Sequence, residues 1–336
     1  MTTQAASPPD PTRPLLSAVI ACHFEEHSID EFHARLMAAL EATGRRYEIV
    51  YVNDGSTDGT LRALEAIFER SLPVSAVIDL FRNAGQAAAL TAGTTFAVGD
   101  ILLYMDSDLQ LDPEDLPRLL AAYDEGADVV SGYRENRRDS LARTIPSRLA
   151  NRVMRRVARA DLRDFGCTFK LVDARLMRGF DVGPHKPIRL PYLIAAAGRT
   201  REVPVAHHAR RYGRSGWTFP KLFRYWMDSL VGASERPFQW LSGALLLVGI
   251  LFIVRVAVNL LWPFSLLGEV TNGLLLNAVV LSFLIGVGVS AAIGEYVLRS
   301  YFLLLQHPAY VVRSVRSRRS GASPDAPPGF VGGSDS

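Results

Sequence analysis

The chain has 336 residues, enough for one large domain and a smaller second part, and its formal net charge of +3 is too small to indicate nucleic-acid binding by itself. Its two cysteines, Cys22 and Cys167, lie far apart, which excludes a disulfide framework and a zinc site of closely spaced cysteines. The N-terminus has no basic segment followed by an apolar core, so we expect residues 1–14 to be disordered and not a signal peptide.

Short apolar runs alternate with helical patterns between residues 15 and 130. This alternation predicts an α/β domain whose mostly parallel sheet is covered by helices on both faces. The expected strands are 15–24, 47–54, 74–81 and 100–106, and the expected helices are 28–44, 58–71 and 84–99. Ser28 and Asp58 are expected to cap the first two helices.

Polar residues follow the expected strands, and parallel sheets bind ligands at the carboxyl ends of their strands. The chain has neither a G-x-G-x-x-G sequence after the first strand nor a Walker lysine loop, which disfavours dinucleotide and P-loop sites. The polar residues are Glu25, Asp54, Arg82, Asn83, Asp106 and Asp108. For Asp54 a plain turn, without a ligand, remains an alternative.

Asp106, Asp108 and Gln110 are spaced by two. On an extended segment their three oxygen donors would face one side, which suits Mg²⁺ or Mn²⁺ shared with a phosphate. The acidic residues of 112–115 instead indicate the first turn of a helix, where the helix dipole favours negative charge.

Residues 237–262 and 270–294 are apolar, and each stretch exceeds the ~20 residues that cross a bilayer. Lys and Arg flank the pair but are absent from the linker, which predicts two transmembrane helices over 237–299 with both termini and the catalytic domain cytoplasmic. Two buried core helices are the alternative.

The segments around this predicted hairpin carry cations. Residues 216–236 combine aromatic residues with Lys and Arg, which indicates juxtamembrane amphipathic helices, with an ordinary packing helix as the alternative. Residues 145–160 form a basic amphipathic pattern that indicates a membrane-surface helix or a solvated face. We expect a second juxtamembrane segment over 300–314 and a disordered basic tail over 315–336.

Several motifs together resemble the inverting family 2 glycosyltransferases with the Rossmann-like GT-A fold, from about Leu16 to about Val312. Within them the chain is similar to the polyprenyl-phosphate group, which includes dolichyl-phosphate mannose synthases and undecaprenyl-phosphate glucosyl- and 4-deoxy-4-formamido-L-arabinose transferases. The motifs are "VNDGSTDGT", "FRNAGQAAALTAG", "DSDLQLDPEDLP", "DVVSGYRENRRDS", "DFGCTFKLVD", "RRYGRSGW" and "GEYVLRSY". The resemblance implies a GT-A domain over 15–215.

The resemblance also implies roles for individual residues. Catalytic roles fall to Asp164 (the proposed base), Asp106 and Arg134, and the metal, Mg²⁺ or Mn²⁺, falls to Asp106, Asp108 and Gln110. The nucleotide sugar would contact Glu25, Asp54, Arg82, Gly85 and Asp106, and the lipid phosphate would contact Arg134, Arg137, Arg210 and Ser215. The sequence departs from the family pattern at residues 21–25, "ACHFE" instead of Pro-x-Tyr-Asn-Glu, and at Gly216 and Trp217, where Lys and Tyr often stand.

The implied function is transfer of a sugar from a nucleotide diphosphate sugar, with UDP-sugars favoured, to undecaprenyl phosphate at the cytoplasmic face of the inner membrane. A GDP-mannose-using transferase and a non-catalytic membrane-tethered binder of sugar nucleotides are the alternatives. A processive polysaccharide synthase is disfavoured because no Q-x-x-R-W motif occurs. The implied partners are the nucleotide sugar, the lipid and the bilayer, without nucleic acid, and family members often form tetramers.

Overall fold

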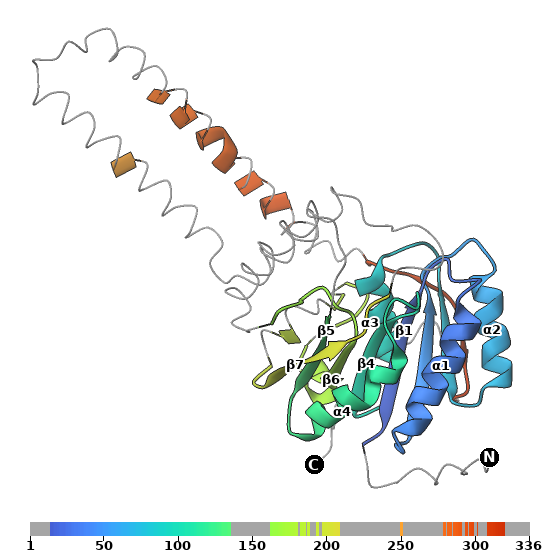
Figure 1. Ribbon diagram of the computed structural model, residues 1–336. Helices are drawn as coiled ribbons and strands as arrows, with labels where there is room; N and C mark the ends of the chain where they lie inside the picture. The colour runs from blue at the N-terminus through green and yellow to red at the C-terminus, as the bar shows by residue number, and fades with distance from the viewer. Residues whose placement is uncertain are drawn as a thin grey trace, which may run out of the picture. The chain divides into compact units, whose positions relative to one another are not determined.

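The computed structural model describes residues 14–135, 162–208 and 308–319, apart from residues 181, 186, 189–192, 195 and 196, together with short pieces between residues 249 and 301. The chain divides into two compact units, Met1–Ala233 with Pro308–Ser336, and Ser234–His307. The strands and the labelled helices belong to the first unit (Figure 1).

The strands of the first unit are Leu16–Cys22 (β1), Tyr47–Asn53 (β2), Val74–Leu80 (β3), Ile101–Asp106 (β4), Val129–Arg134 (β5), Lys170–Asp173 (β6), Thr200–Val205 (β7) and Val312–Ser317 (β8). They form one eight-stranded sheet in the order β7-β5-β6-β4-β1-β2-β3-β8. β3, β2, β1 and β4 pair in parallel, as do β5 and β7. Only β6 and β8 run in the opposite direction, which confirms the predicted α/β fold with a mostly parallel sheet.

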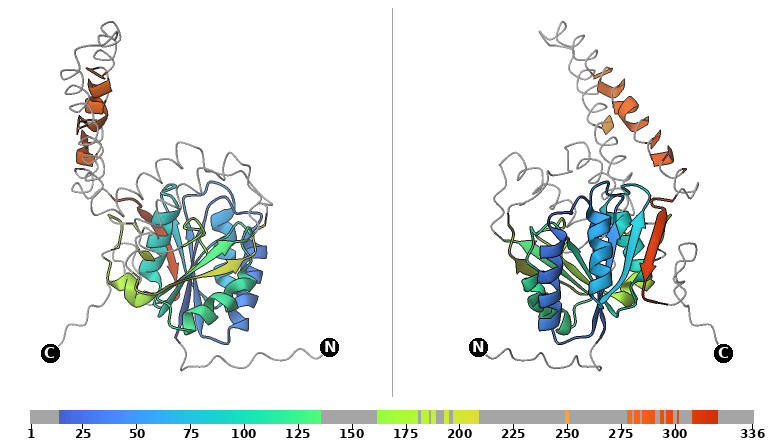
Figure 2. Two further views of the ribbon diagram at one scale, coloured as in Figure 1. Left: turned by 60° about the vertical axis from the view of Figure 1, so that its left-hand side comes forward. Right: turned by 90° about the vertical axis from the view of Figure 1, so that its right-hand side faces the viewer.

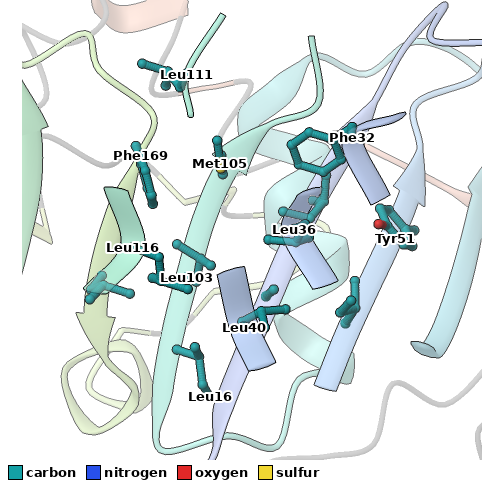
Figure 3. Close-up of a cluster of buried hydrophobic side chains, with 14 of the residues drawn as sticks. Leu16, Phe32, Leu36, Leu40, Tyr51, Leu103, Met105, Leu111, Leu116 and Phe169 are labelled. Atoms are coloured by element: carbon teal, nitrogen blue, oxygen red, sulfur yellow. The ribbon is translucent and has the colours of Figure 1, made fainter. Parts of the chain in front are cut away.

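Helices cover both faces of this sheet. Their bounds are Ile29–Ala42 (α1), Thr60–Arg70 (α2), Gln86–Phe96 (α3), Leu116–Asp124 (α4) and Ala174–Arg178 (α6), and a 3-10 turn spans Pro113–Asp115. α1, α2 and α4 share one core cluster with the sheet, and Figure 3 shows Phe32, Leu36 and Leu40 of α1 in this cluster with Tyr51 and Met105. α3 and α6 pack in the clusters of the opposite face.

Helix α3 lies unusually close to the sheet because of one glycine. A Cβ added to Gly93 would stand 2.4 Å from Cγ1 of Val19 and 3.0 Å from Cγ2 of Val52. Only glycine allows this approach, which brings the first turn of α3 close to the carboxyl ends of β1 and β2.

The helix starts are capped partly as the sequence predicts. Asp58 Oδ1 accepts hydrogen bonds from the backbone N–H of Thr60 at 3.1 Å and from its hydroxyl at 2.6 Å, so Asp58 binds the first N–H of α2, although the N-cap position itself is Gly59. Ser28 precedes α1, but its hydroxyl donates to the carboxylate of Glu25 and caps no helical N–H group.

The C-terminal strand corrects the sequence interpretation. Residues 315–319 were expected in a disordered tail, yet β8 pairs antiparallel with β3, and Figure 2 shows it in red along the edge of the sheet. The unpaired backbone groups of an edge strand such as β3 favour pairing with another strand. Two arginines of the expected disordered tail also form ion pairs: Arg316 pairs with Glu65 at 2.9 Å and with Glu69 at 3.2 Å, and Arg319 pairs with Glu48.

Among the described residues, no helix is long and apolar enough to cross a bilayer. Most of residues 237–299 lie outside the described part of the chain, as do residues 1–13, 216–236 and 320–336. The transmembrane hairpin and the segments around it therefore stay predictions.

Candidate active site

The carboxyl ends of the parallel strands meet at one edge of the sheet, and the predicted site residues gather there. Asp106 is the last residue of β4, and Arg134 is the last residue of β5. Because β6 runs the other way, the residues just before it, including Thr168, lie at this same edge. We call this edge the candidate site.

Asp106 is held from two sides. The amide of Gln86, the first residue of α3, donates to Asp106 Oδ1, and the hydroxyl of Thr168 donates to Oδ2 at 2.7 Å. The two bonds fix the orientation of the Asp106 carboxylate, which the family resemblance predicts to face the nucleotide diphosphate. Neither Gln86 nor Thr168 was predicted. Gln86 lies within the quoted "FRNAGQAAALTAG" motif, which could have indicated it, whereas no sequence signal indicates Thr168.

The segment after Asp106 is not extended. The argument that Asp106, Asp108 and Gln110 face one side because they alternate along an extended segment is therefore wrong. β4 ends at Asp106, and Leu109 has a φ of 57°, in the left-handed region that is unusual for a branched side chain. The backbone therefore turns here, with the Leu109 side chain buried. Asp108 is also buried, and its Oδ1 accepts a hydrogen bond from the backbone N–H of Gln110 at 3.2 Å.

Asp54 connects two loops of the candidate site. Its carboxylate accepts hydrogen bonds from the backbone N–H groups of Ala84, at 2.7 Å, and Gly85, at 3.0 Å. Burial raises the pKa of Asp54, and the two N–H donors oppose that shift. Asp54 therefore does more than form a turn, because its carboxylate holds the segment that contains Arg82 and leads into α3.

Gly55 makes the contact between these loops closer still. Its φ is 63°, and a Cβ at this position would stand 2.3 Å from the carbonyl carbon of Arg82. Glycine is required here both for the conformation and for the space. The "NDGS" turn thus packs directly on the backbone of the loop between β3 and α3.

The loop after β1 contains a strained aromatic residue. Phe24 has a φ of 61° and is 52% exposed, and its N–H donates to the hydroxyl of Ser56 at 3.2 Å. Its ring lies 4.1 Å from that of His23, measured between centroids. Glu25, predicted to contact the nucleoside, is held by the Ser28 hydroxyl through its side chain and by Thr60 through its N–H, at 2.9 Å.

Arg134 and Asp164 form a buried ion pair. The guanidinium donates from Nε to Oδ2 at 2.7 Å and from Nη2 to Oδ1 at 3.0 Å, and the N–H of Gly166 also donates to Oδ1 at 3.1 Å. The carboxylate that the family pattern assigns as a base is thus held by an arginine. Both carboxylate oxygens of Asp164 therefore hold the guanidinium of Arg134 in one orientation.

The end of β7 is tied to the loop after β4. The N–H of His208 donates to the carbonyl of Gln110 at 2.8 Å, and its Nε2 lies 2.7 Å from Asp112 Oδ2. Arg35 also binds Asp112, at 2.5 Å. Burial alone would raise the pKa of Asp112, but the hydrogen bonds from His208 and Arg35 outweigh it and lower this pKa. Asp112 therefore not only precedes a helical turn but also joins His208 and Arg35 through its carboxylate.

The donors at the candidate site have the chemistry that a divalent metal needs. Carboxylates of Asp106 and Asp108 and the amide of Gln110 are hard oxygen ligands, which suit Mg²⁺ or Mn²⁺ when phosphate and water complete the shell. Within the described residues, no group of three or more His, Cys, Asp and Glu side chains is arranged to hold a metal on its own. A divalent metal would therefore fit these residues only if a phosphate group and water complete its ligand shell.

Three predicted contacts to the lipid phosphate, Arg137, Arg210 and Ser215, lie outside the described residues. The described residues do include the segment that leads to two of them, since Arg210 follows His208 closely in the chain. The contacts of His208 with Gln110 and Asp112 therefore fix where this segment leaves the candidate site.

Comparison with known proteins identifies the family. Residues 17–181 match the model for "Glycosyl transferase family 2". The undecaprenyl-phosphate 4-deoxy-4-formamido-L-arabinose transferase of Pseudomonas paraeruginosa is 33% identical to this chain over 326 residues, which cover 93% of each protein.

Solved structures give more distant likenesses. Glucosyl-3-phosphoglycerate synthase from Mycobacterium tuberculosis, in complex with Mn²⁺, UDP and phosphoglyceric acid, is 18% identical with a TM-score of 0.49, covering 66% of this chain and 78% of that one. A mannosyltransferase from Pyrobaculum calidifontis, in complex with GDP-Man and Mn²⁺, is 15% identical with a TM-score of 0.44, covering 77% and 84%. On the family match and the 33% identity across nearly the whole length, the chain belongs to glycosyl transferase family 2, as its motifs predict.

Proposed function

We propose that the protein transfers a sugar from a UDP-sugar to a polyprenyl phosphate, with inversion at the anomeric carbon, at the cytoplasmic face of the inner membrane. The observation that carries the proposal is the 33% identity, over 93% of each chain, with a transferase whose name gives undecaprenyl phosphate as acceptor. The geometry of the candidate site supports it, because a fixed carboxylate (Asp106) and a paired arginine (Arg134) end two strands at one edge.

In the proposed reaction an oxygen of the lipid phosphate attacks the anomeric carbon of the sugar. The bond from that carbon to the nucleotide diphosphate breaks, and the nucleoside diphosphate leaves with the electron pair. The main task of the site is to stabilise the charge on this leaving group. A divalent metal held by Asp106, Asp108 and Gln110 would supply part of that stabilisation by polarising the diphosphate.

The acceptor needs little help to become a nucleophile. The second pKa of a phosphate monoester is about 6, so the lipid phosphate is largely ionised at neutral pH. Asp164 therefore need not remove a proton, and its two bonds to Arg134 suit a different task. We propose that Asp164 orients Arg134 toward the phosphate of the acceptor or of the donor.

The donor test uses the full-length protein in detergent with undecaprenyl phosphate and a panel of radiolabelled nucleotide sugars. The expected result is metal-dependent transfer of label from a UDP-sugar into an organic-extractable lipid, abolished in Asp106→Asn. If label is transferred from GDP-mannose alone, the donor is GDP-mannose and the proposal of a UDP-sugar donor is wrong. Nucleotide binding without a lipid product from any donor would favour a non-catalytic binder and overturn the proposed activity.

A further inference from the structure

The inference begins at a buried carboxylate outside the candidate site. Asp79 is near the end of β3, and only 1% of its surface is exposed. Its Oδ1 accepts a hydrogen bond from the Asn53 amide at 2.7 Å, whereas its Oδ2 is buried and accepts no hydrogen bond within the described residues. A buried carboxylate oxygen in this state requires a nearby cation, because removing a negative charge from water is costly.

The cation comes from the C-terminal strand. Nη1 of Arg313, on β8, lies 3.3 Å from Asp79 Oδ2, and this is the one ion pair of Asp79 among the described residues. Nη2 of Arg313 donates to the carbonyl of Phe81 at 2.8 Å, and the guanidinium lies 5.2 Å from the centre of the Phe81 ring. Arg313 therefore contacts both Asp79 and the first residue of the loop between β3 and α3.

A β-bulge brings Arg313 to this place. In the β3–β8 ladder Asp79 pairs with Ser314, and the next residue, Leu80, pairs with Val312. Arg313 is thus the extra residue of β8 between two ladder pairs. Bulges redirect a side chain from the regular alternation of a strand, and they occur often next to functional sites.

Asp79 and Phe81 both lead to the loops of the candidate site. Asn53, the partner of Asp79, also accepts a hydrogen bond from the Ser56 N–H, at 3.4 Å. The neighbouring Asp54 binds the N–H groups of Ala84 and Gly85, at the other end of the loop that Phe81 begins. Contacts thus run continuously from Arg313 to the two loops that carry Asp54, Arg82 and Gly85, the residues that the family resemblance assigns to the nucleotide sugar.

We propose that Arg313 is a positioning residue for nucleotide binding, supplied by the strand that follows the predicted transmembrane segments. It neutralises Asp79 and anchors Phe81, and through Asn53 and the 81–85 loop it fixes the two loops against each other. This inference rests on the proposed function, because it requires that the protein uses a nucleotide diphosphate sugar and that these loops contact it.

Arg316 provides a matched control on the same strand. It pairs with Glu65 and Glu69, whose side chains are 34% and 66% exposed, so its partners are surface residues of α2 and not the candidate site. Replacing Arg316 removes an equal charge from β8 without leaving a buried carboxylate unpaired.

The experiment measures the affinity of the full-length protein for UDP in the presence of Mg²⁺ by calorimetry, together with the KM values for the donor and for undecaprenyl phosphate. We expect Arg313→Gln to weaken UDP binding and raise the donor KM by about tenfold or more, the range that supporting residues of a site typically show. The KM for the lipid should stay within about twofold of wild type, because only the nucleotide loops are affected, and Arg316→Gln should leave both KM values within the same range. A substitution that only destabilises the protein in general would instead change the KM for the donor and the KM for undecaprenyl phosphate to a similar extent.

If Arg313→Gln does not fold, the double variant with Asp79→Asn removes the buried charge that needs a counterion. Weakened UDP binding in the folded double variant would support the inference, because Phe81 is still unanchored, and wild-type affinity would overturn it. Unchanged UDP affinity in a folded Arg313→Gln would also overturn the inference. Wild-type protein that binds neither UDP nor GDP would overturn the proposed function, and the inference with it.

Discussion

Arg134 and Asp164 form an ion pair through two hydrogen bonds, from Nε to Oδ2 at 2.7 Å and from Nη2 to Oδ1 at 3.0 Å. This geometry uses both carboxylate oxygens to orient one guanidinium. It matches planar bidentate pairing, which only arginine provides. Asp164 is therefore arranged to set the direction of Arg134.

The first prediction tests this role with Asp164→Asn. The variant keeps the shape of the side chain but loses its charge and one acceptor. We expect kcat to fall about ten- to hundredfold, from the ~1.5–3 kcal/mol of a hydrogen bond to a charged group. The pH profile of kcat/KM should keep its wild-type form. Loss of a titration limb in the profile would instead identify Asp164 as a base.

The second prediction concerns Asp108. Its replacement by Ala removes a hard oxygen donor from the proposed metal set, so we expect sugar transfer to fall by roughly a hundredfold and to require more Mn²⁺ for half-maximal rate. Steady-state rates across a Mn²⁺ titration measure both effects. Metal-dependent transfer near the wild-type rate in Asp108→Ala would show that the assignment of Asp108 as a metal ligand is wrong.

The third prediction concerns the residues that hold Asp106. Thr168→Val keeps the volume but removes the hydroxyl that donates to Oδ2 at 2.7 Å, so Asp106 loses one of two constraints. We expect kcat/KM for the donor to fall about tenfold. Thr43→Val is the control, because its hydroxyl binds the Leu40 carbonyl at the far end of α1. Equal losses in both variants would refute the positioning role.

The fourth prediction uses the strain at Phe24. Its φ of 61° is unfavourable for any residue with a Cβ, so Phe24→Gly should raise the free energy of unfolding by about 1 kcal/mol relative to Phe24→Ala. Both variants lose the exposed ring, and we expect both to raise the donor KM equally if the ring contacts the nucleotide. Chemical denaturation and donor kinetics separate the two effects. Donor KM values equal to wild type would assign no nucleotide contact to the ring.

The fifth prediction is a pH dependence of stability at His33. Its Nδ1 lies 2.9 Å from the Tyr51 hydroxyl in a buried position, and burial, with a smaller contribution from Arg70, lowers the pKa of His33 to about 4. Because the unfolded chain takes up this proton at the ordinary pKa of about 6.5, protons favour the unfolded state. The stability that His33 contributes is thus complete above that pKa and decreases as the pH falls from about 6.5 to about 4.

Urea denaturation at about pH 7 and about pH 5 tests this sign. The wild-type midpoint should fall more between the two values than the midpoint of His33→Gln, which cannot take up a proton. Equal decreases would show that His33 titrates alike in both states.

The sequence predicts the parts of the fold that depend on local patterns. The strands up to Asp106 and the contact of Asp58 with the start of α2 follow from apolar runs and from residue preferences at helix starts. The strand-end rule also predicts that Asp54 and Asp106 lie at one edge of the sheet, because parallel strands end at the same edge, whereas Arg134 was expected only from the family resemblance.

Contacts between distant segments were not predictable from these patterns. Thr168 meets Asp106 only because β6 is inserted antiparallel beside β4, and no periodicity records that pairing. The alternation argument failed at Leu109, where the backbone turns through the left-handed region with the side chain buried. Arg313 was expected in a juxtamembrane segment and Arg319 in a disordered basic tail, whereas the groups that accept their hydrogen bonds lie more than two hundred residues earlier.

The position of β8 in the chain has a consequence for synthesis. The edge of β3 lacks its partner until the residues after Pro308 leave the ribosome, which happens only after the predicted membrane segments have been made. Until then the nascent domain has an unpaired strand edge and an Asp79 without its cation. The sheet is therefore completed last, so a chain that ends prematurely within its apolar segments lacks both β8 and the arginine that pairs with Asp79.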